Sequence, residues 1–198
     1  MFTASLIRAA LVALALPLAG PAAAAAGDRD PDVQVRLDGE HIRADATMFV
    51  RASQQRVWAV VTDYERAPEF TPDLEESTVL ARSGNTLRVK QKTRVRFGPF
   101  SIPIETVRDI KLTRPVRAES RLVEGSMKRY DATMELVPEP GGTRVVFRSV
   151  AVPDSALAGF ATESLVKRET ETHFRQLRAE IMRREHLASL KAGERARP

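Results

Sequence analysis

One segment, residues 86–97, restricts the fold of this chain more than any other, because every second position along it is a cation. The cations, which alternate with uncharged residues, are Arg88, Lys90, Lys92, Arg94 and Arg96. Side chains of a β-strand point to opposite faces with a period of two, so the segment is predicted to be a strand with one basic face. Five cations cannot be buried together without partners. The uncharged face must therefore be the inner one.

The inner face of this strand is apolar except for two polar residues. Leu87, Val89 and Val95 share it with Gln91 and Thr93. A few polar groups on an apolar wall are typical of a pocket in which they orient a ligand. Gln91, Thr93 and Val95 are accordingly candidate ligand-binding residues. In the alternative interpretation, the two polar groups bond only to water or to neighbouring backbone.

Seven further segments have the composition and spacing of strands, and they are 33–37, 42–50, 76–82, 102–112, 117–123, 128–137 and 143–152. Asp38-Gly39 predicts a tight hairpin turn between the first two, because it supplies the positive φ values that such a turn needs. The period becomes helical over about 158–185, where one face carries Val166, Thr170, His173, Phe174, Leu177 and Ile181. Together these segments predict an α+β fold. Its curved antiparallel sheet has about seven strands around a long C-terminal helix, with two short helices after the first strand.

The ends of the chain differ in character from this domain, which is predicted to span residues 41–185. Residues 1–26 combine a cation, a short apolar run and an alanine-rich cleavage zone, which is typical of a signal peptide cut after Ala25 or Ala26. The apolar run is shorter than the roughly 20 residues that span a bilayer. Export to the periplasm or secretion is therefore expected, with an uncleaved anchor as the alternative. Residues 27–40 are interpreted as a polar leader and hairpin strand, and residues 186–198 as a polar tail.

The net charge of +5 arises from a surface on which both signs are mixed. A basic chain can bind nucleic acid, but no motif with interleaved aromatic residues is present, and export argues against such a partner. The basic face of 86–97 permits transient contact with an anionic membrane surface. In the alternative, this face is solvated and pairs with Glu105 and Asp109 of the next strand. The oligomeric state stays open.

Segment 102–112 brings two more polar side chains to the predicted inner wall. If Ile104 and Ile110 face inward, alternation places Thr106 and Arg108 beside them. An inward arginine needs a carboxylate, phosphate or carbonyl partner. The alternatives are that Arg108 lies at the sheet edge, or that a bulge turns it outward.

Three further candidates come from segment 128–137 and the last helix. Tyr130 shares a strand face with Met134, so its hydroxyl can point at a ligand. His173 is the one histidine placed on the apolar face of the helix, where it is either a general acid or base or a packed core residue. The three histidines of the chain have no metal-ligand spacing, and no cysteine is present. We predict no metal, no cofactor and no recognisable catalytic set.

Several short motifs occur in a fixed order over about residues 42–184. They are VWAVVTDYE at 57–65, PEFTP at 68–72, EGSM at 124–127, GGTRV at 141–145 and LRAEI at 177–181. In this order they resemble the START-like (SRPBCC) superfamily, in its polyketide cyclase/dehydrase and lipid-transport branch. The resemblance implies a helix-grip fold, in which the sheet wraps the last helix and leaves a pocket between them.

The resemblance implies no particular reaction, since a shared fold does not determine function and the family includes both carriers and aromatase/cyclases. The predicted pocket and the lack of a recognisable catalytic set favour a carrier. We expect periplasmic binding or transfer of an apolar or amphipathic ligand, such as a lipid, isoprenoid, quinone or sterol-like molecule. The alternatives are a cyclase- or hydrolase-type enzyme that uses the same pocket, and an interaction module of the cell envelope.

Overall fold

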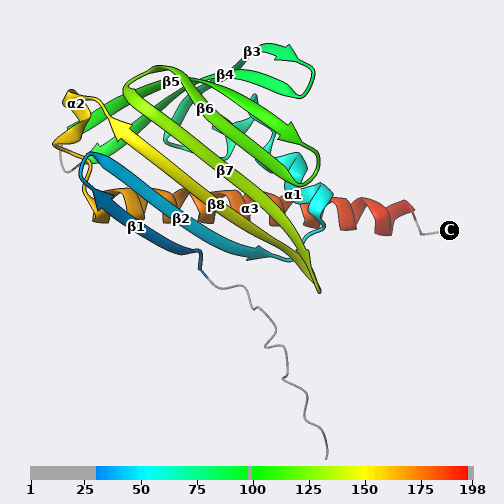
Figure 1. Cartoon of the computed structure of the whole chain (residues 1–198). Coiled ribbons are helices and arrows are strands. Elements are labelled where there is room, and N and C mark those ends of the chain that lie inside the picture. The colour runs from blue at the N-terminus through cyan, green and yellow to red at the C-terminus, as the bar shows by residue number, and fades with distance from the viewer. Residues whose placement is uncertain (1–29, 98–99, 196–198) are drawn as a thin grey trace, which may run out of the picture.

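An antiparallel sheet wrapped around one long helix dominates the computed structural model, which describes residues 30–97 and 100–195 (Figure 1). The strands are β1 (Asp32–Asp38), β2 (His41–Val50), β3 (Leu74–Ser83), β4 (Thr86–Phe97), β5 (Phe100–Thr113), β6 (Arg117–Gly125), β7 (Met127–Glu139) and β8 (Gly142–Pro153). The helices are α1 (Gln54–Val61), the 3-10 turn η1 (Ala67–Glu69), α2 (Ser155–Ala158) and α3 (Glu163–Arg195). The α+β helix-grip prediction is confirmed. The predicted signal peptide lies outside the described residues.

The sheet has eight strands in the order β1-β2-β8-β7-β6-β5-β4-β3, against about seven predicted. All eight strand-like segments of the sequence form strands, and β1 pairs with β2 from Asp32↔Thr47 to Asp38↔His41, as the predicted hairpin requires. Gly39, at φ 60°, makes the tight turn between them. Because β1 comes first, the two short helices α1 and η1 follow the second strand and not the first.

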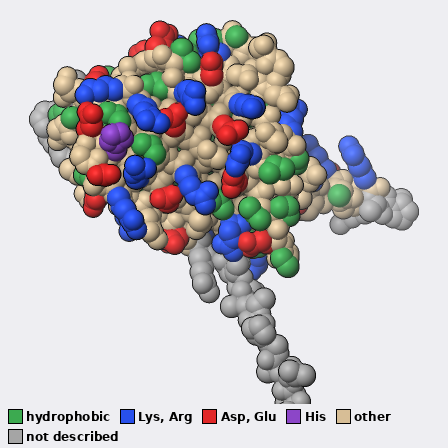
Figure 2. Space-filling model, viewed as in Figure 1, with side chains coloured by type: hydrophobic (Ala, Val, Ile, Leu, Met, Phe, Trp, Pro, Cys, Tyr) green, Lys and Arg blue, Asp and Glu red, His purple; other side chains and the backbone are tan. Residues whose placement is uncertain are grey.

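The two faces of β4 are sorted as its alternation predicts. Leu87 and Val89 are 6% and 0% exposed, whereas Arg88 between them is exposed. Three of the five outer cations pair with acids of neighbouring strands: Arg88 with Asp109 at 2.8 Å, Lys92 with Glu105 at 4.0 Å, and Arg94 with Glu75. Figure 2 likewise shows Lys and Arg side chains interspersed with Asp and Glu. The outer face is thus a mixed-sign, paired surface.

The last helix is longer than the sequence predicts, because α3 continues past residue 185 to Arg195. The added residues are mostly strong helix formers such as Leu187 and Leu190, and the first glycine comes only at position 193. This part projects beyond the sheet in Figure 1, and Leu187 and Leu190 are 43% and 53% exposed. No helix in the described part of the chain is long and apolar enough to cross a membrane.

The middle of α3 supplies the centre of the hydrophobic core. Phe174, Leu177 and Ile181 are 1%, 3% and 1% exposed, and they follow one face of the helix. They cluster with Val57 of α1 and with apolar residues from the concave face of the sheet, including Val145 of β8. This packing holds the helix against one end of the sheet.

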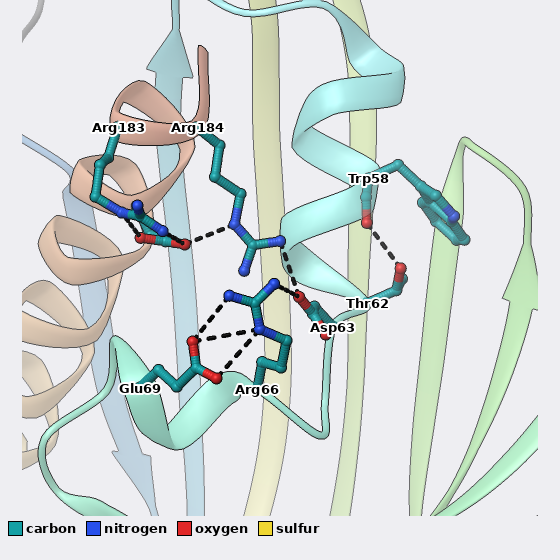
Figure 3. A network of polar contacts seen from close by, with 8 residues as sticks. Trp58, Thr62, Asp63, Arg66, Glu69, Arg183 and Arg184 are labelled. Atoms are coloured by element: carbon teal, nitrogen blue, oxygen red, sulfur yellow. Dashed lines mark hydrogen bonds and ion pairs between the residues drawn. The ribbon is translucent and has the colours of Figure 1, made fainter. Parts of the chain in front are cut away.

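A polar cluster joins α3 to the segment that contains α1 and η1 (Figure 3). Arg184 of α3 donates from Nη1 to Asp63 at 2.8 Å and from Nε to Glu180 at 2.6 Å. Its guanidinium also lies 5.7 Å from the ring centroid of Phe70. Glu180 is only 6% exposed and accepts a second charged hydrogen bond from Arg183 at 2.7 Å. We call Asp63, Glu180, Arg183 and Arg184 the α3 clamp.

Replacing Ile181 with Ala tests the packing of α3. The change removes buried methyl groups and leaves a cavity, so we expect the free energy of unfolding to fall by about 2–5 kcal/mol. Leu187→Ala, on the exposed part of the same helix, is the matched control and should change it by less than about 0.5 kcal/mol. Both are measured by urea denaturation. Equal effects of the two substitutions would contradict the observed packing.

Replacing Glu180 with Gln tests the α3 clamp through its pH dependence. Hydrogen bonds from Arg183 and then from Arg184 lower the pKa of Glu180 from 4.5 to about 2. A carboxylate whose pKa is lower in the folded state adds stability above its unfolded pKa, and this stability is lost as the pH falls toward the folded value. We expect Glu180→Gln to cost about 1.5–3 kcal/mol at neutral pH and progressively less below pH 4.5.

The control for this experiment is Glu65→Gln, which breaks an exposed pair with Arg82. An exposed pair contributes little, so its loss should change stability by less than about 0.5 kcal/mol. A cost of Glu180→Gln that stayed constant down to acidic pH would mean that ionisation of Glu180 does not stabilise the fold.

Candidate ligand-binding pocket

A cavity of about 450 Å³ lies between the concave face of the sheet and α3. Its volume is within the range of small-molecule sites, and its lining is mostly apolar. The structure brings all eight candidate residues to its wall: Gln91, Thr93, Val95, Thr106, Arg108, Tyr130, Met134 and His173. Asp63 of the α3 clamp and Phe70 also line the cavity. Through Asp63, the clamp ties this part of the pocket wall to α3.

The register of β4 and β5 explains how five of these residues meet. Gln91 pairs with Thr106, and Val89 with Arg108, so the inward positions of the two strands lie side by side. β5 does carry a bulge against β6, between Val107 and Arg108. Arg108 nevertheless faces the pocket and lies neither at the sheet edge nor on the outer face. The prediction of an inward arginine is therefore confirmed.

Arg108 is held by neutral groups. Nη2 donates to Oε1 of Gln91, Nη1 lies 3.5 Å from Oγ of Ser120, and the guanidinium carbon is 5.5 Å from the ring centroid of Tyr130. Gln91 in turn donates from Nε2 to Oγ of Ser77 at 3.0 Å. The buried Nε of Arg108 has no hydrogen-bond partner in the described part of the chain.

Two tyrosines and one histidine face the same end of the pocket. Burial raises the pKa of Tyr64 to about 12 and also raises the pKa of Tyr130, although the nearby charge of Arg108 opposes both shifts. His173 is exposed to the cavity itself. Desolvation of the imidazole by the surrounding protein is the main cause that lowers the pKa of His173, and the charge of Arg108 is the second. At neutral pH the wall therefore presents two phenol hydroxyls, a neutral imidazole and one guanidinium.

Tyr64 and Ser120 are among the polar residues of this wall that sequence reasoning did not predict as site residues. Ser120 follows Ala118 at the two-residue spacing of an inward strand face, and both line the pocket, so alternation along β6 could have found it. Tyr64 lies between α1 and η1, where no strand or helix periodicity predicts its direction. Only the placement of that segment against the sheet brings Tyr64 to the pocket.

The side chains of the pocket wall are better suited to binding a ligand than to catalysing a reaction. His173 makes an edge contact with Phe174 at 5.9 Å, and no hydrogen bond to it is present among residues 30–97 and 100–195. A general base is usually oriented by such a bond. Within the same ranges, no cluster of three or more His, Cys, Asp or Glu side chains could hold a metal ion.

Three solved structures with the same fold are informative. They are a START superfamily protein from Mycobacterium smegmatis (15% identity, TM-score 0.61, covering 71% of this chain and 97% of that one), the ZhuI aromatase/cyclase from Streptomyces sp. R1128 (18%, 0.62, 73% and 95%) and a STAR-related lipid transfer protein from Xanthomonas axonopodis (15%, 0.61, 77% and 94%). At these identities the likeness establishes the fold alone.

The sequence itself identifies the family. A search of curated proteins found no match. The family model described as polyketide cyclase/dehydrase and lipid transport, however, matches residues 50–177, from the end of β2 to the core of α3. This region contains nearly all of the pocket wall. Because the match covers well over half of the chain, the protein belongs to the polyketide cyclase/dehydrase and lipid transport family.

Proposed function

We propose that the protein binds and transfers an apolar or amphipathic ligand, such as a lipid, isoprenoid, quinone or sterol-like molecule, in the pocket between the sheet and α3. The observation that carries this proposal is a cavity of about 450 Å³ whose wall is mostly apolar and which contains a group of polar side chains around Arg108. Each 100 Å² of apolar ligand surface that enters such a cavity contributes about 2.5 kcal/mol. Affinity would come from the apolar body, and orientation from the polar end.

A second candidate is an enzyme of the cyclase or dehydrase type that uses the same pocket. The observation in its favour is that His173, Tyr64, Tyr130 and Arg108 line one cavity, which combines a neutral imidazole with hydroxyl and guanidinium hydrogen-bond donors. The carrier is preferred because no described hydrogen bond orients His173 as a base. Recovery of the bound molecule unchanged after incubation supports the carrier, whereas a converted product supports the enzyme.

Filling the pocket tests the proposed function. Ala132 of β7 lines the cavity, and Ala132→Phe would occupy part of the space that a ligand needs. We expect native mass spectrometry to show a copurifying apolar molecule with the parent protein and much less of it with the variant. The matched control is Thr133→Phe, at the next position on the opposite strand face, and it should leave the ligand content unchanged. Equal ligand loss in both variants would contradict the pocket as the binding site.

We also propose that the protein works outside the cytoplasm, on the basis of the signal-peptide pattern in residues 1–26. We expect the mature protein to begin near Ala26 or Gly27 and to occur in the periplasmic fraction. N-terminal sequencing of the fractionated protein measures both. An intact leader in the membrane fraction would instead identify an uncleaved anchor.

A further inference from the structure

The pocket contains a cation without a counter-charge. The contacts of Arg108 with Gln91, Ser120 and Tyr130 are all with neutral groups, and its buried Nε has no described partner. Among residues 30–97 and 100–195, no carboxylate forms an ion pair with Arg108. A buried charge is costly unless it is paired, so an arginine held in this way is poised to receive an anion.

Acids near this end of the molecule are engaged elsewhere. Asp109, the next residue along β5, faces outward and pairs with Arg88 at 2.8 Å. Asp63, on the pocket wall, is held by Arg184 at 2.8 Å, and Glu169 lies 3.3 Å from Arg168. None of them neutralises Arg108. Asp73 also lines the cavity, and no ion pair between it and Arg108 is present in the described part of the chain. Arg108 is therefore left without an adjacent counter-charge.

The groups around Arg108 are suited to an anion rather than to a second cation. Tyr64 and Tyr130 stay protonated at neutral pH and can donate from their hydroxyls. The neutral ring of His173 can donate one N–H. Gln91 uses its carbonyl oxygen to hold Arg108, and its amide is anchored on Ser77. It therefore acts as a positioning residue that aims the guanidinium.

We propose that the ligand is an anionic amphiphile whose carboxylate or phosphate group binds Arg108 inside the pocket, with its apolar body along the surrounding wall. This inference rests on the proposed function and narrows it to one ligand class. Guanidinium binds both acid types through paired N–H donors. Neutral alcohols, esters and sterols lack the charge that Arg108 leaves unbalanced.

Matched amphiphiles test the charge requirement. Isothermal titration calorimetry with dodecanoate, dodecyl phosphate and dodecanol, each below its aggregation limit, compares one apolar chain with three head groups. A hydrogen bond to a charged group discriminates by about tenfold to a hundredfold. We expect at least one acid to bind the protein tighter than dodecanol by that factor. The tighter of the two acids identifies the head group as carboxylate or phosphate.

Substitution of Arg108 assigns the effect to this residue. Arg108→Met keeps much of the apolar volume, so dodecanol should bind as before while the preference for the acids disappears. Arg108→Lys retains the charge and should retain part of the preference, which keeps the test open if the methionine variant fails to fold. The matched control is Arg88→Met on the outer face of β4, which should leave all three affinities unchanged.

A spectroscopic readout is independent of affinity. Because the charge of Arg108 contributes to the lowered pKa of His173, a bound anion should raise that pKa, and bound dodecanol should not. NMR titration of the imidazole protons measures it. Equal binding of acid and alcohol, or a preference that survives Arg108→Met, would overturn the anion inference and leave the carrier function standing. Failure of all three amphiphiles to bind would overturn the carrier function itself.

Discussion

The packing of α3 into the curved sheet is the interaction on which the rest of the structure depends. Phe174, Leu177 and Ile181 fill the space between helix and sheet with large buried side chains. Thr170 and His173 of the same helix line the cavity, and Phe174 and Leu177 border both the core and the cavity. α3 therefore packs in the core and also forms part of the pocket wall.

The α3 clamp ties α3 to the segment that contains α1 and η1. Asp63 and Phe70 belong to the pocket wall, and Arg184 connects both of them to the helix beneath the sheet. Because Glu180 is almost fully buried and accepts bonds from two arginines, the cluster fixes the direction as well as the position of the helix. The segment that carries Asp63 and Phe70 is thus tied to α3 at the pocket wall.

Charge is distributed in opposite ways on the two faces of the sheet. The outer cations of β4 face acids on adjacent strands and remain in contact with water, so they contribute modestly to stability. Arg108 lies on the inner face among apolar and neutral groups, where the effective dielectric is lower. The inward Arg108 therefore carries more functional meaning than the five cations on the outer face of β4.

Local periodicity in the sequence determined the strands, the inward and outward faces of β4 and β5, and the apolar face of α3, because each depends only on neighbouring residues. It therefore predicted Gln91, Thr93, Thr106 and Arg108 as inward residues. Tertiary structure alone decided that Tyr64 joins them, since that residue lies between α1 and η1 without a period of its own. It also decided that Gln91 accepts a hydrogen bond from Arg108. No carboxylate pairs with Arg108 in the described part of the chain. This depends on which side chains, far apart in the sequence, the strand order brings next to Arg108, and local periodicity does not predict it.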